Sequence, residues 1–251
     1  MKQEMMAFER RFAEALSGSV LPMDEVLQYV ASARGKRLRP RLVFMSARLF
    51  GEVNEATRRT ALFVELLHTA TLIHDDVVDG SDQRRGQPSV NVRWDNKTAV
   101  LVGDYLLSKA IQVLADPADR RILNEMLGTA MVMSEGELLQ SAASRKDVLS
   151  ANQYLDIIKR KTARLMKACC VGGALSVGAT DEQVAAVGEF GLSYGMMFQM
   201  RDDIADDDDP TVTALAIQLL PEYQEKTRNA LKSLSYSMLL MRNSMGHKES
   251  L

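Results

Sequence analysis

The chain has 251 residues, a formal net charge of -2 and 25% charged residues. A charge this close to zero excludes nucleic acid as a bulk electrostatic partner, and no apolar run reaches the roughly 18 residues that a membrane-spanning helix requires. No apolar signal segment follows the N-terminus, and the only cysteines, Cys169 and Cys170, are adjacent, which argues against a disulfide or a metal site. We therefore expect one cytoplasmic domain over residues 1–251, with Cys169 and Cys170 in its core.

Helical periodicity runs through the chain, because apolar residues recur every three or four positions and alternating β-branched runs are nearly absent. Glycines and prolines separate the periodic stretches, as helix breakers do. The pattern predicts an all-α fold. In chain order, the expected helices span about residues 2–16, 23–33, 40–50, 55–79, 96–115, 118–142, 151–176, 181–207 and 213–245.

The first motif in chain order is a basic turn at residues 35–41, with the sequence GKRLRPR. Pro40 stands at or near the start of the following helix, whose free amide groups favour an anion. Arginine guanidinium groups match phosphate oxygens in two-point contacts. The turn therefore indicates a phosphate site, although a solvated basic turn explains this motif equally well when it is taken alone.

An aspartate-rich motif, HDDVVD, ends the helix expected at 55–79. Asp75 and Asp79 are four positions apart and share one face of a helix, where like charges repel by a few tenths of a kcal/mol. Apolar neighbours make the ionised carboxylates costlier still. Magnesium would offset this repulsion, since it binds one or two carboxylates, keeps several waters and takes further oxygens from a phosphorylated substrate.

The same helix and the loop after it carry further candidates. The helix is apolar on more than one face over residues 62–73, which is typical of the centre of a bundle. Acidic side chains on a central helix must face a cavity, because burial without partners is prohibitive. His68 lies two turns before Asp75 on nearly the same face. In the following loop, Arg84 and Arg85 are close enough in sequence to bend back toward the acidic cluster.

The second half of the chain repeats the pattern. Lys161 and Thr162 lie in the helix expected at 151–176, where a lysine charge and a hydroxyl group favour an anion. A second aspartate-rich motif, QMRDDIAD at residues 199–206, places Asp202 and Asp206 on one helix face. Two acidic clusters and three basic elements around a cavity predict a site for metal and phosphate.

Together these motifs strongly resemble the trans-isoprenyl diphosphate synthases, also called polyprenyl synthetases. The resemblance covers about residues 30–210 in the family's order. It implies the isoprenoid synthase fold, a single-domain helical bundle around a deep central cavity. The matching segments are 35–40, 68–79, 84–86, 103–107, 135–140, 161–162 and 198–206.

The resemblance implies head-to-tail condensation of an allylic diphosphate with isopentenyl diphosphate, which releases pyrophosphate and adds one five-carbon unit. About three Mg²⁺ ions per site would neutralise the charge that grows on the leaving pyrophosphate. The departing pyrophosphate would take the final proton, so the resemblance implies no dedicated protein base.

The resemblance also implies a role for each matching residue. The metal ligands would be Asp75, Asp79, Asp202 and Asp206. The catalytic set would be Asp75, Asp76, Asp79, Asp202, Asp203 and Lys161. The allylic diphosphate would be bound by Arg84, Lys161, Thr162 and Gln199, and isopentenyl diphosphate by Lys36, Arg39, His68 and Arg85.

Product length should depend on the side chains that line the cavity below the first acidic cluster. Ala70 and Thr71 are small, and they lie where short-chain members of the family carry aromatic side chains. A growing prenyl tail could pass this level, which favours a medium-chain or long-chain all-trans product, roughly heptaprenyl to nonaprenyl. Ala70 as a plain close-packing residue, and with it a short-chain synthase, remains the alternative.

The chain departs from the family after Asp206. Residues 207–209 are all aspartate and lead into the last helix, without the lysine-bearing and glycine-bearing lid that family members usually carry. An internal deletion at about 207–213 fits this pattern. A non-catalytic partner subunit of a synthase is therefore an alternative. A terpene cyclase or a head-to-head synthase fits less well, because the ordered basic motifs imply a second diphosphate pocket.

The resemblance also implies partners other than the two diphosphates. Family members form homodimers through apolar helix faces, and segments 105–111 and 126–133 are candidates for such a face. A greasy product implies transient membrane contact for its release. No nucleic acid partner is expected.

Overall fold

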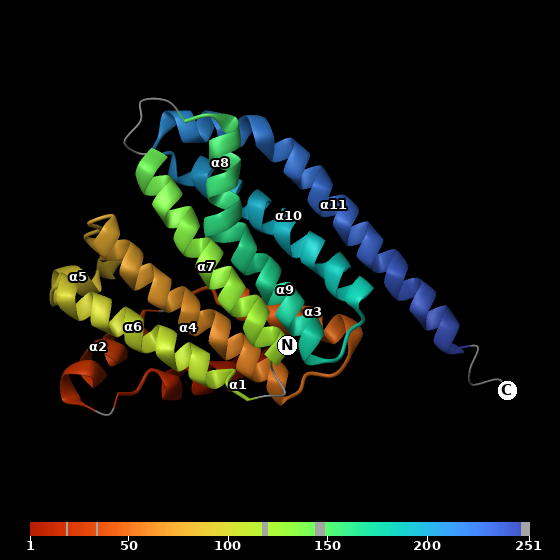
Figure 1. Ribbon diagram of the computed structural model, residues 1–251, viewed down its shortest axis with the longest axis horizontal. Helices are drawn as coiled ribbons and strands as arrows, with labels where there is room; N and C mark the ends of the chain where they lie inside the picture. Colours follow the sequence, from red (N-terminus) through yellow and green to blue (C-terminus); the bar gives the residue numbers. More distant parts are fainter. Residues whose placement is uncertain (19, 34, 117–119, 144–148, 247–251) are drawn as a thin grey trace.

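The computed structural model describes residues 1–18, 20–33, 35–116, 120–143 and 149–246. Of residues 236–246 it describes the backbone only. It is helical almost throughout, which confirms the all-α expectation (Figure 1). In chain order the elements are α1 (Lys2–Ala15), α2 (Leu21–Ser32), α3 (Leu38–Phe50), α4 (Glu55–Val78), β1 (Gln83–Arg84), β2 (Gln87–Pro88), α5 (Val90–Arg93), α6 (Asn96–Val113), α7 (Arg120–Ala143), α8 (Ala151–Ile158), the π-helical turn η2 (Lys159–Ala163), α9 (Arg164–Ser176), α10 (Asp181–Asp206) and α11 (Pro210–Gly246).

Helix α9 forms the centre of the bundle, in contact with α3, α4, α7 and α10 (Figure 1). From Ala168 to Ala174 every residue is apolar and buried, as expected of a central helix, and the two basic residues of α9, Arg164 and Lys167, lie in its first turns. Cys169 and Cys170 are both buried and unbridged, which confirms them as core residues. Gly173 lets α9 approach α3 closely, because a Cβ there would lie 2.3 Å from the carbonyl oxygen of Val43.

The long helices α4 and α10 present the two acidic clusters at their C-terminal ends. Each begins with a capping box, at Asn54 and Thr180 respectively, which satisfies the free amides of the first turn. Asp79 is the C-cap of α4 and Asp206 the last residue of α10. The C-terminal end of a helix carries partial negative charge, so carboxylates there are disfavoured. This placement adds to the requirement for a cation.

Three elements were not anticipated from the periodicity. A two-stranded hairpin and the short helix α5 follow α4, and the helix expected at 151–176 is interrupted by η2. A π-helical turn inside a helix is rare and often marks a functional position. Here it carries Lys161 and Thr162. The start of the helix expected at 118–142 lies outside the described residues, which resume at Arg120.

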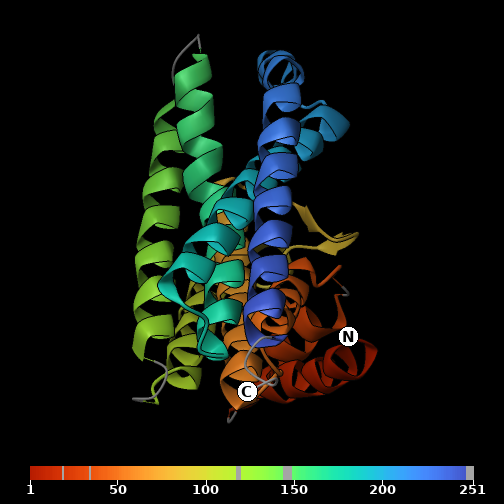
Figure 2. The ribbon, with the colours of Figure 1, turned by 90° about the vertical axis from the view of Figure 1, so that its right-hand side faces the viewer.

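Helix α11 follows α10 after only residues 207–209 and packs along it, as Figure 2 shows. The helix expected at 213–245 is therefore present, three residues longer at its start. Within the described residues, no helix combines the length and the apolar character that a membrane crossing needs.

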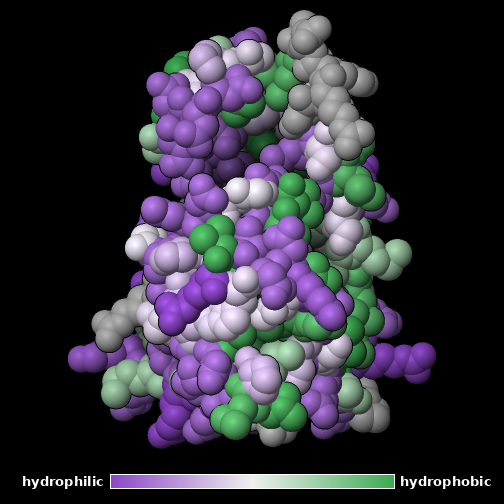
Figure 3. Space-filling model, turned by 90° about the vertical axis from the view of Figure 1, so that its left-hand side faces the viewer, coloured by the Kyte–Doolittle hydropathy of each residue, from purple (hydrophilic) through white to green (hydrophobic). Residues whose placement is uncertain are grey.

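One face of the molecule is hollowed between its upper and lower parts, and both hydrophilic and hydrophobic side chains border the hollow (Figure 3). A cavity of about 490 Å³ lies between α7, α8, η2, α10 and the start of α11. A smaller cavity of about 40 Å³ lies between α2, α4 and the hairpin. Expected site residues line both.

Candidate active site

Asp75 and Asp79 form the outer pair of the first acidic cluster. Burial raises the pKa of Asp75 to about 6, opposed by the nearby charge of Lys161 and reinforced by Glu137 and Asp79. Asp79 is exposed. None of the ion pairs found in the described part of the chain involves either carboxylate. The outer pair therefore concentrates negative charge that no basic side chain there neutralises.

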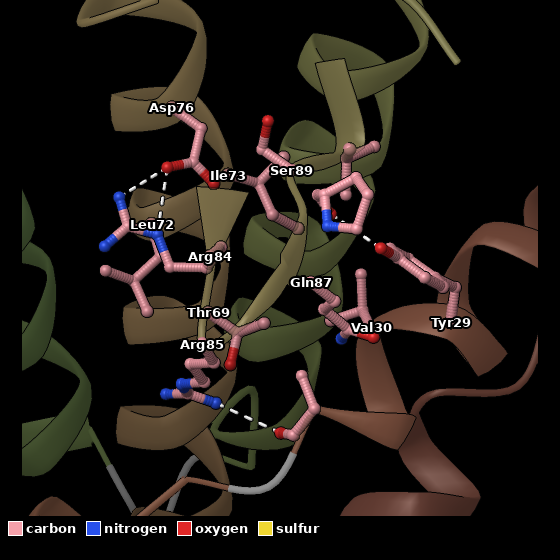
Figure 4. A pocket seen from close by; sticks show the side chains of 13 residues that line it. Tyr29, Val30, Thr69, Leu72, Ile73, Asp76, Arg84, Arg85, Gln87 and Ser89 are labelled. Atoms are coloured by element: carbon pink, nitrogen blue, oxygen red, sulfur yellow. Dashed lines mark hydrogen bonds and ion pairs between the residues drawn. The ribbon is translucent and has the colours of Figure 1, made fainter. Parts of the chain in front are cut away.

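Asp76, between them, is committed to a protein partner. It is 2% exposed, and Nε of Arg84 donates a hydrogen bond of 2.9 Å to its Oδ1, with a second, closer contact from Nη2 (Figure 4). The hairpin holds Arg84 in place, because Arg85 and Gly86 at its turn both have positive φ, as a tight two-residue turn requires. Asp76 thus orients Arg84 through its Oδ1 atom.

Three of the residues expected to bind isopentenyl diphosphate meet beside α4. Nη1 of Arg39 lies 2.9 Å from Nε2 of His68. Because a guanidinium group only donates, Nε2 accepts and the ring proton resides on Nδ1. Burial, followed by the charge of Arg39, holds the pKa of His68 well below its usual range, so the ring is neutral. The Arg85 guanidinium lies against Gly35, where a Cβ would be 2.9 Å away, and donates to the carbonyl of Ala33 at 3.3 Å.

Asp202 faces this basic group from α10. Burial raises the pKa of its carboxyl group, the neighbouring Asp206 adds to the shift, and Lys36 and Arg39 oppose it. Lys36 and Asp206 are both exposed. The fourth residue expected to bind isopentenyl diphosphate thus lies within electrostatic reach of the second acidic cluster.

Asp203 is committed to neutral partners. Tyr154 donates to its Oδ2 at 2.5 Å, and Nε2 of Gln199 donates to its Oδ1 at 2.8 Å. Oγ1 of Thr162 donates in turn to Oε1 of Gln199 at 2.8 Å. Tyr154 was not among the residues expected from the sequence. Its place two turns before Lys161 was the only signal that could have indicated it.

Lys161 lies between the first cluster and α7. Its Nζ contacts Oε2 of Glu137 at 2.7 Å and Oε1 of Gln140 at 3.0 Å. Oε1 of Glu137 is buried and has no hydrogen-bond partner within the described chain. Glu137 lies in segment 135–140, which resembles the family, and its sequence position alone indicates no role. The structure shows that it holds Lys161, which faces the cavity of about 490 Å³ together with Thr162 and Gln199.

The expected chain-length residues lie in the packed part of α4. Ala70 is 1% exposed and belongs to the hydrophobic core. Oγ1 of Thr71 donates to the carbonyl of His68 at 3.0 Å. Neither residue lines the cavities of about 40 and 490 Å³. Their effect on product length therefore stays a prediction.

The acidic clusters fit magnesium only with help from a ligand. Among the described residues, no three acidic, histidine or cysteine side chains converge into a complete metal site. Each cluster instead offers two carboxylates one turn apart. Mg²⁺ favours such a partial set, because it takes its remaining oxygens from water and substrate phosphate. The donor chemistry therefore fits a metal that arrives with a diphosphate.

An all-α bundle with paired carboxylates at the ends of two central helices, and cationic groups around them, defines the class of isoprenoid synthase folds. Residues 21–214 match the family model described as Polyprenyl synthetase. The chain belongs to this family, as the resemblance of its motifs indicated.

Curated relatives agree with this assignment. The chain is 37% identical over 205 residues to the all-trans-nonaprenyl-diphosphate synthase (geranyl-diphosphate specific) of Rhodobacter capsulatus, a match covering 81% of this chain and 63% of the relative. It is 34% identical over 204 residues to the octaprenyl diphosphate synthase of Escherichia coli K12, with the same two coverages. The chain thus spans about 63% of the length of these relatives.

Solved structures show the same fold. A polyprenyl synthase from Caulobacter crescentus CB15, complexed with calcium and isoprenyl diphosphate, has a TM-score of 0.79 and 36% identity over 82% of this chain and 62% of that one. A decaprenyl diphosphate synthase from Rhodobacter capsulatus has a TM-score of 0.80 and 34% identity over 96% of this chain and 82% of that one. The second match leaves only 4% of this chain uncovered, so it includes most of α11.

Proposed function

We propose that this chain condenses an allylic diphosphate with isopentenyl diphosphate, head to tail, in a magnesium-dependent reaction that releases pyrophosphate. The observation that carries the proposal is the presence of two separate cationic groups. Arg39 and Arg85 meet beside the neutral His68, and Arg39 lies within electrostatic reach of Asp202 in the second cluster. Lys161 lies within electrostatic reach of Asp75 in the first cluster and faces a separate cavity. A condensation of two diphosphates requires two such subsites, whereas a terpene cyclase requires one.

The outer carboxylates would hold the metal ions, about three in number by resemblance to the family. Bound Mg²⁺ would supply Lewis-acid neutralisation of the leaving pyrophosphate. Asp76 keeps Arg84 directed at the diphosphate, and Asp203 keeps Gln199 and Thr162 in a fixed arrangement. The metal-binding residues we propose are Asp75, Asp79, Asp202 and Asp206.

The second subsite would bind isopentenyl diphosphate through Lys36, Arg39, His68 and Arg85. Nε of Arg39 supports this assignment, because it is a buried donor without a hydrogen-bond partner in the described part of the chain. An unsatisfied buried donor is costly, and a phosphate oxygen would satisfy it. Neutral His68 adds a hydrogen-bond donor at Nδ1. Because the ring carries no charge, it adds no repulsion to that among Lys36, Arg39 and Arg85.

We propose that residues 1–251 form a single domain and that this domain makes a medium-chain or long-chain product. Ala70 offers a small side chain in the expected path of the tail, and relatives at 34–37% identity are named octaprenyl and nonaprenyl synthases. A short-chain geranyl or farnesyl product is the alternative, since no cavity described near the site reaches Ala70.

We also propose a homodimer, a cytoplasmic location and transient membrane contact during product release. Helices α6 and α7 support the dimer, because they expose Leu101, Met131 and Leu138, the last two at 68% and 73%. Met126 and Met133, at the ends of the segment expected to form such a face, are buried and fill the core instead.

The direct test is incubation of the purified chain with labelled isopentenyl diphosphate, Mg²⁺ and each of three allylic primers, followed by sizing of the hydrolysed products. A ladder that stops near eight units is the expected result, and chelation of the metal should abolish it. A dominant three-unit product would contradict the long-chain assignment.

The second candidate is a partner subunit that supports a separate synthase. The short connection at residues 207–209 favours it, because it leaves no room for the lid that family members usually carry. Absence of turnover with every primer, in a folded chain that still binds Mg²⁺ and pyrophosphate, would favour this candidate over the enzyme.

A further inference from the structure

The basic turn before α3 contains an arginine that has a different environment from its neighbours. Arg37, the N-cap residue of α3, adopts a left-handed conformation with φ 50° and ψ 38° and is 8% exposed. A residue other than glycine pays a steric cost in this conformation, and the surroundings must hold it there. Lys36 and Arg39, the proposed phosphate ligands, flank it.

The surroundings hold Arg37 from two helices. Its Nη1 donates to Oε1 of Glu65 on α4 at 2.8 Å, and Glu65 is 2% exposed. Its Nε donates to Oε1 of Glu9 on α1 at 3.1 Å. The guanidinium carbon lies 4.4 Å from the centre of the Phe12 ring, within the range of a cation–π contact. The side chain therefore turns away from the proposed site and is occupied by protein groups.

The anchor on α4 lies one turn from a proposed substrate ligand. Glu65 precedes His68 by three residues, and positions three apart are neighbours on a helix surface. Arg37 therefore contacts α4 at Glu65, and Arg39 contacts α4 at His68, where its Nη1 lies 2.9 Å from Nε2 of the ring. These two parallel contacts fix both the position and the rotation of the turn relative to α4.

We propose that Arg37 is a positioning residue that binds no substrate. Its ion pair with Glu65, supported by Glu9 and Phe12, holds the strained turn so that Lys36 and Arg39 converge on one diphosphate. The inference rests on the proposed function, because it assigns that diphosphate to isopentenyl diphosphate. The allylic subsite at Lys161 lies on other helices and does not depend on this anchor.

The primary variant is Glu65→Gln, which preserves side-chain shape and removes the buried charge. A second variant, Arg37→Gly, removes both anchors and relieves the left-handed strain, so its effect cannot be attributed to a clash. For each, the KM for isopentenyl diphosphate should rise about tenfold or more, while the KM for the allylic diphosphate stays within about twofold. A role limited to overall stability would lower the melting temperature without separating the two KM values.

The matched control is Arg48→Gln. Arg48 pairs with Glu4 and thereby joins α3 to α1, as Arg37 joins α3 to α1 and α4, but it does so at the far end of α3. This variant should leave both KM values unchanged. An equal rise in both KM values in Glu65→Gln, or the same selective rise in Arg48→Gln, would overturn the positioning role.

Calorimetric titration with isopentenyl diphosphate separates this inference from the proposed function. If the parent chain binds the ligand but shows no turnover, the proposed function fails, and the comparison of affinities still tests Arg37. Weaker binding by about tenfold in Glu65→Gln and Arg37→Gly, at a temperature where circular dichroism shows both folded, supports the inference. Equal affinity in the parent and both variants overturns it, and so does a parent that binds no isopentenyl diphosphate.

Discussion

The two aspartate-rich motifs have the same spacing, yet their middle carboxylates have different partners. Asp76 pairs with the charged Arg84 of the hairpin, whereas Asp203 accepts hydrogen bonds from the neutral Tyr154 and Gln199. In both motifs the outer carboxylates form no ion pair with any residue that the structure describes, and we propose them as metal ligands. The difference teaches that one repeated motif can position a cation at one site and a set of neutral donors at the other.

Burial sharpens this contrast. Asp76 is almost completely buried, whereas its partner Arg84 is partly exposed. Water therefore reaches the guanidinium group of the pair but not its carboxylate. Loss of one charge from such a pair leaves the other without compensation. The bonds to Asp203 are also made to a charged acceptor, but each neutral donor can bond to water when it is released. We therefore expect the first cluster to be more sensitive to neutralisation than the second.

The largest expected effect is a loss of turnover of similar size for the outer carboxylates of both clusters. Asp75→Ala and Asp202→Ala should each reduce turnover by about 10³-fold or more, because each removes a proposed metal ligand from charge that develops on the leaving group. Circular dichroism should show both variants folded. Steady-state kinetics with activity within about threefold of the parent in both would remove the metal assignment.

The next effect separates the clusters. Asp76→Asn should reduce turnover by about 10²-fold and lower the melting temperature, since it neutralises the buried partner of Arg84, whereas Asp203→Asn should reduce turnover by about tenfold. Kinetics and thermal melts on the two variants measure the difference. Equal losses, or a larger loss in Asp203→Asn, would show that the contrast between the middle carboxylates has no functional consequence.

A smaller effect tests the neutral network alone. Tyr154→Phe removes the hydroxyl group that donates to Asp203 and should raise the KM for the allylic diphosphate about fivefold, since one hydrogen bond to a charged group is lost. The KM for isopentenyl diphosphate should not change. Tyr223→Phe is the control, because this tyrosine lies on α11 beside Lys226, away from Asp203 and from the proposed substrate ligands. Identical kinetics in Tyr154→Phe and the parent would remove Tyr154 from the site.

The smallest expected effect on rate comes from substitutions five residues before each cluster, which test product length. Ala70→Tyr, five residues before Asp75, should shorten the product, because the aromatic ring would block the tail. It should also lower the melting temperature, because Ala70 is buried in the core. Met197, five residues before Asp202, occupies the corresponding position on α10, and Met197→Ala should leave product length unchanged. Chromatography of the hydrolysed products measures both, and an unchanged length in Ala70→Tyr would place the obstruction elsewhere.

Most of the secondary structure could be predicted from the sequence, because helical periodicity and breakers are local signals. The expected helices match α1, α3, α4 and α10 to within a few residues. The hairpin could not be predicted in this way, since its two-residue strands are too short to show a period. The π-helical turn was also missed, because one extra residue in a turn leaves the apolar pattern around it almost unchanged.

The candidate site was predictable in its components but not in its connections. Asp75, Asp79, Asp202 and Asp206 follow from spacing alone, because positions four apart share a helix face. The contacts of Arg37 did not follow, although it stands inside a recognised motif. Its partners lie on α1 and α4, and no local pattern indicates which of several neighbouring cations turns inward.

The sequence by itself determined the helical class and the helix faces on which the carboxylates lie, because helix periodicity depends only on residues near in the chain. It also determined the family, because the motifs that identify the family are short and follow one another in a fixed order. The tertiary structure decided which carboxylates have side-chain partners. Tyr154 reaches Asp203 across 49 positions, and Arg37 reaches Glu65 across 28. Such contacts depend on how whole helices pack, and packing is a property of the assembled core rather than of any segment.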